Sequence, residues 1–236
     1  MKLLIVDKRI SSKCEHALEK EGFYLIKLPP DPNLGEAVSS HPDTVLFHAD
    51  GEIITTADYC DFAAYIFSDI RELKPDMRIS FSADKRTDKY PADCIMNALV
   101  IGRRIFAKAD TLSKSILKFA KNGGYEIVHT NQGYPACTVL AFGNSAITAD
   151  EGMASLLREN GIRVTLISKG GISLPPYDYG FIGGASGVVG RKIYFFGDLN
   201  SHPDSAVIRK AIEEEGFIPV SLSDERLRDL GGMILL

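Results

Sequence analysis

A pattern of strand, strand, helix and strand over residues 134–168 constrains the fold of this chain more than any other feature. Residues 136–143 are apolar and rich in β-forming side chains, and a Gly-Asn turn signal separates them from a second apolar run at 145–149. Asp150 then stands at a helix N-cap position, followed by apolar residues at helical spacing and an Asn-Gly stop. The β-branched run 162–167 closes the unit as a third strand.

The same unit recurs along the whole chain, which indicates a repeat architecture. The first copy lacks its opening strand, and the apolar tail of the chain is a lone strand that fits the gap. A first unit completed by the last segment implies a closed ring, because the terminal strand must pair with the opening one. We predict one α/β domain of five units, residues 1–30 with 230–236, then 41–83, 92–130, 134–168 and 178–223.

One aspartate stands at the corresponding point of each unit, between the second strand and the helix. A carboxylate at this point is expected to cap the helix by accepting hydrogen bonds from its first backbone N–H groups. That role explains the residues without any catalytic chemistry. The five residues are Asp7, Asp58, Asp110, Asp150 and Asp198.

The composition argues against several classes of partner. With 27 Lys and Arg against 31 Asp and Glu, the net charge is −4, and no broad positive surface is available to bind nucleic acid. The four cysteines are far apart and form no metal-binding motif, so we expect no metal ion and no cofactor. The apolar start is too short for a signal peptide or a membrane span, which favours a cytoplasmic protein without a membrane partner.

Two short strings carry a more specific signal. His41-Pro42-Asp43-Thr44-Val45 is similar to the His-x-Asp-Thr-Val string of arginine deiminases, and residues 133–138 (GYPACT) are similar to the surroundings of their cysteine nucleophile. Together with the predicted ring, these strings resemble the pentein superfamily. This fold is the five-bladed α/β propeller of arginine deiminases, dimethylarginine hydrolases and amidinotransferases. The strings at 132–134, 180–184 and 197–198 are also similar to those of an uncharacterised bacterial family with this fold.

The resemblance implies a site at the centre of the ring, where the first strands of the units line the axis. Its chemistry is attack by a cysteine thiolate on a guanidino carbon, with a histidine as proton carrier and carboxylates that hold the planar cation. In this chain the resemblance assigns Cys137 as the nucleophile and His41 as the acid and base. The expected substrate-binding residues are Asp43, Asp93, Asn97, Asp178, Gly183 and Gly184.

The chain also departs from the pattern of the superfamily. Those enzymes carry the nucleophile in the terminal strand, where this sequence has Gly231-Gly232, so the match requires a ring whose units are rotated. Cys137 also fits a small buried apolar residue, Asn97 a structural hydrogen bond, and the glycines a closely approached inner strand.

Two functions therefore stay open. The first is a hydrolase or transferase that acts on a small guanidino or amidino compound. The second is a non-catalytic binding protein that resembles the ribosome anti-association factor of this fold, which is the one case in which a nucleic-acid partner is expected. Preferential labelling of Cys137 by iodoacetamide favours the enzyme. The sequence does not indicate an oligomeric state.

Overall fold

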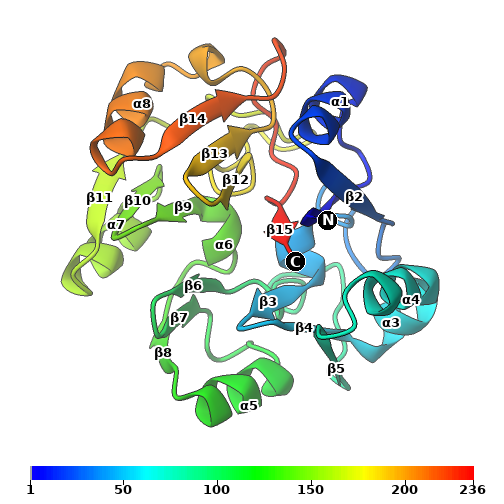
Figure 1. The fold of residues 1–236 in the computed structure, drawn as a ribbon. Coiled ribbons are helices and arrows are strands. Elements are labelled where there is room, and N and C mark those ends of the chain that lie inside the picture. Colours follow the sequence, from blue (N-terminus) through cyan, green and yellow to red (C-terminus); the bar gives the residue numbers. More distant parts are fainter. Residues whose placement is uncertain (1) are drawn as a thin grey trace.

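The computed structural model describes residues 2–236, which form five three-stranded sheets arranged around a central axis (Figure 1). In each sheet the first strand is antiparallel to the middle one and the third is parallel to it. The sheets are β15 (Ile234–Leu235), β1 (Lys2–Asp7) and β2 (Phe23–Leu28); β3 (Phe47–Ala49), β4 (Glu52–Thr56) and β5 (Arg78–Ser82); β6 (Leu99–Ile101), β7 (Arg104–Ala107) and β8 (Glu126–His129); β9 (Val139–Phe142), β10 (Ser145–Thr148) and β11 (Arg163–Leu166); β12 (Ser186–Val189), β13 (Lys192–Phe195) and β14 (Ile218–Ser221).

The chain closes into a ring through its last strand. β15 pairs antiparallel with β1, with Leu235 opposite Leu4, and the backbone N–H of Leu236 donates to Leu3 at 3.0 Å. The first unit thus receives its missing strand from the C-terminus, which confirms the predicted ring closure. The arrangement is a five-bladed α/β propeller, the predicted fold class.

The longer helices cover the outside of the ring, and the first strands of the units surround its centre (Figure 1). Each helix buries an apolar face against its sheet, as Ile66, Phe67 and Ile70 do beneath β4. The outer helices are α1 (Ser12–Lys20), α3 (Ala57–Phe62), α4 (Ala64–Leu73), α5 (Lys114–Gly123), α7 (Glu151–Glu159) and α8 (Ser205–Glu214). Within residues 2–236, no helix combines the length and the apolar character that a membrane crossing requires.

Short helices precede the first strands of two units. The predicted strand at 136–143 begins instead with the four-residue helix α6 (Pro135–Thr138), and α2 (Pro42–Val45) lies at the same place before β3. In both, proline occupies the first helical position, where its fixed φ fits and its missing N–H costs nothing. The first strands of the third and fifth units, β6 and β12, are also short.

The predicted capping role of the five aspartates is correct for two of them. Asp150 accepts from the N–H of Met153, and Asp198 caps only the short 3₁₀ helix Leu199–Ser201, after which α8 begins. In the other units a hydroxyl side chain precedes the helix and takes the N-cap position. The caps of α1, α3 and α5 are Ser11, Thr56 and Ser113, so that Asp7, Asp58 and Asp110 are not caps.

Candidate active site

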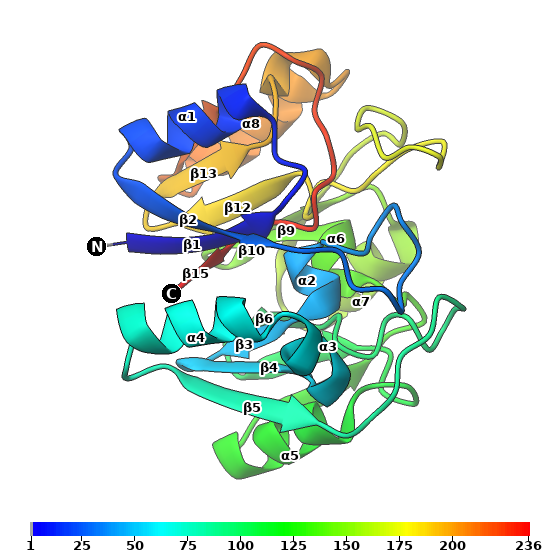
Figure 2. The ribbon, with the colours of Figure 1, turned by 90° about the vertical axis from the view of Figure 1, so that its right-hand side faces the viewer.

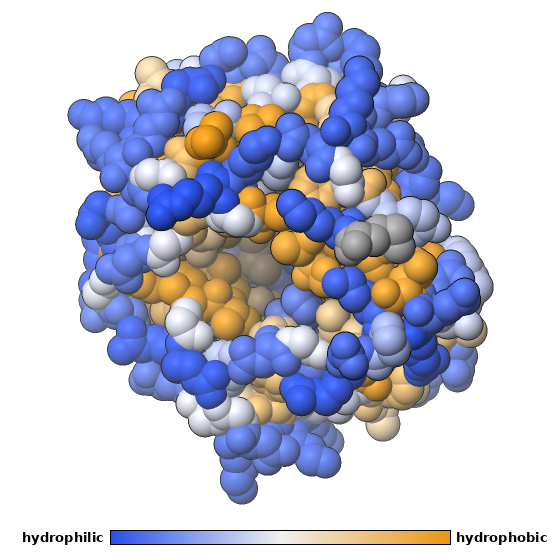
Figure 3. Space-filling model, viewed as in Figure 1, coloured by the Kyte–Doolittle hydropathy of each residue, from blue (hydrophilic) through white to orange (hydrophobic). Residues whose placement is uncertain are grey.

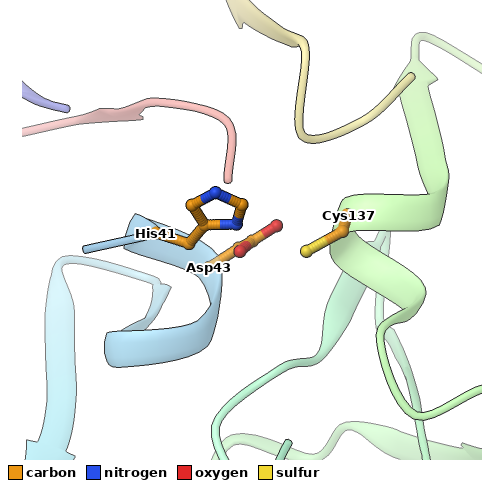
Figure 4. A group of neighbouring side chains, drawn as sticks. All are labelled: His41, Asp43 and Cys137. Carbon is orange, nitrogen blue, oxygen red and sulfur yellow. The ribbon is translucent and has the colours of Figure 1, made fainter. Parts of the chain in front are cut away.

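The two short helices bring their polar side chains together at the centre of the ring. His41 directly precedes α2, Asp43 lies in its first turn, and Cys137 lies in α6. One nitrogen, one carboxylate oxygen and the sulfur of these residues all lie within 4.8 Å of one another. Figure 4 shows the Asp43 carboxyl group between the His41 ring and the Cys137 sulfur. Residues of the second and fourth units therefore meet in one cluster.

Asn97 fixes the position of the thiol. Its side-chain N–H donates to the Cys137 sulfur at 3.3 Å, and its carbonyl oxygen accepts from the backbone N–H of Ala136 at 2.9 Å. Asn97 is 1% exposed, so these contacts satisfy a polar group that would otherwise be buried alone. The structural hydrogen bond considered for this residue is present, and it acts on the candidate nucleophile itself.

Two further aspartates, which the sequence analysis did not place in the site, flank the His41 ring. An oxygen of Asp7 lies 3.8 Å from Nε2, and an oxygen of Asp229 lies 3.8 Å from Nδ1. Asp229 is held by the backbone N–H groups of Phe181 at 2.8 Å and Gly231 at 3.0 Å. Among the described residues 2–236, neither ring nitrogen has a hydrogen-bond partner. The sequence position of Asp229 could have indicated its place in the site, because it directly precedes the terminal segment 230–236 that lies at the centre of the ring.

Burial favours the uncharged forms of these side chains. Burial and the charge of Asp229 raise the pKa of Asp43 to about 8. Burial also raises the pKa of Asp229 and, together with Asp43, raises the pKa of the Cys137 thiol well above its usual value. Burial lowers the pKa of His41, although both neighbouring carboxylates act in the opposite direction. The cluster thus contains acids and a thiol without a matching positive charge, which suits a cationic ligand.

A pocket of about 590 Å³ reaches the cluster, with Cys137, His41 and Asp229 among its lining residues. The connections after β5 and β11 project on the face where it opens, opposite the two termini (Figure 2). Most of the lining is aromatic or acidic. These side chains are Tyr90, Tyr134, Tyr177, Tyr179, Phe181, Asp88, Asp93, Asp178 and Asp229.

Two predicted substrate-binding aspartates line this pocket at different depths. Asp93 is buried, and one of its oxygens accepts from the hydroxyl of Tyr134. Asp178 is exposed at the rim. Asp43 instead lines a second hollow of about 420 Å³ that enters from the opposite face and is lined mostly by residues with apolar side chains (Figure 3). The cluster therefore lies between two hollows on the axis of the ring.

Gly183 and Gly184 pack closely against the segment that carries Cys137. A Cβ atom at Gly183 would lie 2.3 Å from the carbonyl oxygen of Ala136, and one at Gly184 would lie 1.9 Å from Asp229. The backbone N–H of Gly184 donates to the carbonyl oxygen of Cys137 at 2.8 Å. Close approach explains both glycines, and a direct substrate contact by either one stays a prediction.

The segment before the terminal strand cannot carry a side chain beside His41. Gly231 has φ +68°, and a Cβ atom there would lie 2.2 Å from the Cβ of His41. His41 thus occupies the space that a cysteine at position 231 would need. This contact is consistent with a site rotated around the ring.

The cluster has the chemistry to bind a cation of more than one kind. A thiolate, an imidazole and a carboxylate are the usual ligands of divalent transition metals, and carboxylates also hold guanidinium groups through paired hydrogen bonds. The aromatic walls of the pocket add apolar surface, which favours an organic cation over a hydrated metal ion.

Proteins with known structures share the fold of this chain. An amidinotransferase of the saxitoxin pathway from Microseira wollei has TM-score 0.58 and 13% identity, over 93% of this chain and 77% of that one. A dimethylarginine dimethylaminohydrolase variant from Pseudomonas aeruginosa, in complex with citrulline, has TM-score 0.57 and 10% identity, over 94% and 92%. Inosamine-phosphate amidinotransferase from Streptomyces griseus has TM-score 0.56 and 12% identity, over 98% and 91%.

These likenesses show the fold, which is that of the pentein superfamily. No curated protein matches the sequence significantly. The model of a family described as "Family of unknown function (DUF6873)" matches residues 5–234. The chain therefore belongs to this family.

Proposed function

We propose that this protein is an enzyme of the guanidine-modifying type, in which Cys137 attacks the central carbon of a small guanidino or amidino compound. The observation that carries the proposal is the meeting of Cys137, His41 and Asp43 within 4.8 Å, where Cys137 and His41 also line a pocket that contains acidic side chains. The solved structures that share the fold, a dimethylaminohydrolase and two amidinotransferases by name, support this class of substrate.

The buried acids provide the binding site for the cation. A guanidinium group presents several coplanar N–H donors, which match carboxylate oxygens in paired hydrogen bonds. Asp43 has a buried oxygen without a partner among residues 2–236, and Asp229 lies at the same depth beside His41. An arriving cation favours the ionised forms of Asp43 and Cys137, since a nearby positive charge lowers the pKa of both groups. Substrate binding thereby produces the thiolate.

The reaction then proceeds through a covalent intermediate. The proton of the Cys137 thiol passes to His41, and the thiolate forms an S–C bond with the central carbon. His41 returns the proton to the leaving nitrogen as the C–N bond breaks, so that an amine leaves. Water attacks the S–C carbon and gives one proton to His41. The S–C bond breaks, the second proton of the water passes to the departing Cys137 sulfur, and His41 releases its proton to solvent. When an amine takes the place of water, the same steps transfer the amidino group.

A pair of alkylating reagents tests the recognition of a cation. Chloroacetamidine is cationic and chloroacetamide is its neutral counterpart, with the same leaving group. We expect Cys137 to react at least about tenfold faster with the cation, because the acidic cluster binds it with charge-assisted hydrogen bonds. Cys60 is the control, since it is only half-buried and lies in α3. Peptide mass spectrometry after limited labelling gives both rates, and an equal preference at Cys137 and Cys60 would contradict the proposal.

Turnover is tested with a panel of guanidino and amidino compounds, by detecting the released amine or ammonia and the ureido product. Cys137→Ser is expected to reduce the rate by at least about a thousandfold, because a serine hydroxyl is a far weaker nucleophile without activation. The matched control is Cys14→Ser, a buried cysteine of α1 outside the pocket. Full activity of Cys137→Ser would exclude the mechanism.

A further inference from the structure

The pocket above Cys137 carries charge of one sign only. Among its lining residues within the described range 2–236, none is a lysine or an arginine. The acids are distributed over its depth. Asp229 lies at the base, Asp93 in the wall, and Asp88 and Asp178 are exposed at the rim. A ligand that fills the pocket therefore meets carboxylates at both of its ends.

Asp93 has one carboxylate oxygen without a hydrogen-bond donor among residues 2–236. The residue is only 7% exposed, and the hydroxyl of Tyr134 donates to its other oxygen. The first of these oxygens is buried and accepts no hydrogen bond from any residue of the described range. A buried carboxylate oxygen without a donor is costly, and Asp93 lines the pocket, so a donor on a ligand there would satisfy this oxygen.

Aromatic side chains surround the mouth of the pocket. Tyr90 is 56% exposed and Tyr177 is 59% exposed, and both line the pocket. The faces of such rings attract cations, and their apolar surfaces pack against methylene groups. This combination of rings and carboxylates suits an alkyl chain that ends in a second positive charge.

The nearest arginines do not offer a site for a carboxylate in the pocket. Arg9 donates to Asp7 and to the backbone carbonyl oxygens of Glu36 and Ala37, so most of its N–H groups are already used. Arg228 is exposed and is not part of the pocket lining. A ligand with a carboxylate at its outer end would face Asp88 and Asp178 instead of a cation.

We propose that the substrate is a dication without a carboxylate, with a guanidino or amidino group at Cys137 and an amine at the outer end of an alkyl chain. This inference rests on the proposed function and specifies its substrate class. Asp93 and Asp178 receive the amine, and the rings of Tyr90 and Tyr177 cover the chain. The pocket thereby excludes α-amino acids such as arginine.

Three ligands that differ only at the outer end test this proposal. They are butylguanidine, 4-aminobutylguanidine and 4-guanidinobutanoate. Their dissociation constants are measured with wild-type protein, by protection of Cys137 against chloroacetamidine. We expect the amine to bind at least about tenfold more tightly than butylguanidine, and the carboxylate at least about tenfold more weakly, as charge-assisted hydrogen bonds and like-charge repulsion require.

Two variants locate the effect. Asp178→Asn changes an exposed side chain and is expected to reduce the ratio between the amine and butylguanidine by at least about threefold, and Asp93→Asn by more, since Asp93 is buried. Arg228→Ala is the control and should leave the order of the three ligands unchanged.

The outcomes separate this inference from the proposed function. If butylguanidine binds as tightly as 4-aminobutylguanidine, the proposal of a dicationic substrate is wrong, and the proposed guanidine-modifying function is unaffected. Tighter binding of 4-guanidinobutanoate, lost in Arg228→Ala, overturns it in favour of a carboxylate ligand. If no guanidine protects Cys137, both proposals fail together.

Discussion

Asp43 illustrates how a proposed binding role carries a stability cost. Its carboxyl group is held between His41 and Cys137 (Figure 4), and one of its oxygens accepts a 3.2 Å hydrogen bond from Thr44. Burial and Asp229 raise its pKa to about 8, so the empty protein keeps the proton at neutral pH. A residue arranged in this way destabilises the free protein and gains its full interaction only when a cation arrives.

The stability of the protein should therefore depend on pH through Asp43. In the unfolded chain the carboxyl group has a pKa of about 3.9, below the folded value of about 8. The folded state thus binds the proton of Asp43 more tightly than the unfolded chain does. This proton binding stabilises the fold at low pH, and the stabilisation is lost as the pH rises from about 3.9 to about 8.

Asp43→Asn removes the titrating carboxyl group, so the stability of the variant should depend less on pH. We expect the variant to be more stable than wild type by on the order of 3 kcal/mol at pH 8, with a much smaller difference at pH 5. Thermal melts from pH 5 to pH 9 measure this difference, and Asp178→Asn at the exposed rim is the control. The same variant should lose protection of Cys137 by guanidines. Equal melting curves at both pH values would contradict the account of Asp43.

At the scale of elements, the site depends on two helices that sequence patterns cannot reveal. α2 and α6 have four residues each, too few for any hydrophobic periodicity, and they interrupt runs that read as continuous strands. Other elements were predicted well, since the strands predicted at 145–149 and 162–167 correspond to β10 and β11. The N-cap predictions were wrong where a nearby Ser or Thr, such as Thr56 or Ser113, is the N-cap residue instead of the aspartate.

The terminal segment before β15 is shaped to leave space for His41, and a paired substitution tests this. Gly231 and Gly190 both have φ near +60°, at +68° and +60°. A Cβ atom at Gly231 would lie 2.2 Å from His41, whereas one at Gly190 would meet no atom within 4 Å. The two positions therefore share the backbone strain and differ in the steric contact.

We expect Gly190→Ala to cost about 1 kcal/mol, the strain of a left-handed alanine. Gly231→Ala should cost at least about 3 kcal/mol, because the added methyl group also displaces a buried side chain. Chemical denaturation measures both values. A displaced His41 should also slow the reaction of Cys137 with chloroacetamidine in Gly231→Ala, with no change in Gly190→Ala. Similar costs for the two variants would show that the contact with His41 is easily relieved.

At the scale of the whole molecule, the site exists only because the ring is closed. His41 and Cys137 come from the second and fourth units, and Asp229 comes from the segment just before the C-terminal tail, so no local pattern relates them. Recurring units and the missing first strand were sufficient to predict the ring. The meeting of His41 with Cys137 was predicted from the resemblance of the strings at 41–45 and 133–138 to those of a known superfamily. The positions of Asp7 and Asp229 beside His41 were not predicted, because a sequence does not show which side chains near the ring axis contact one another.

Because the two chain ends meet in one sheet, they can be joined and new ends can be made in another loop. A circular permutant tests this. β15 and β1 are neighbours, so about four Gly and Ser residues can join Leu236 to Lys2. New ends are placed between Pro75 and Asp76, two exposed residues between α4 and β5 that do not line the pocket. All five sheets and the cluster remain intact in this design.

We expect the permutant to fold, to melt within about 5 °C of wild type, and to keep the preference of Cys137 for chloroacetamidine. The control is the native chain without residues 234–236, which loses the β1 pairing and the packing of Ile234 and Leu236 on the core. That chain should lose at least about 2 kcal/mol of stability, because it exposes an edge and apolar surface. If the shortened chain matches wild type in stability and labelling, the terminal strand does not hold the ring together. Cys137 and His41 would then owe their proximity to the contacts of the inner helices alone.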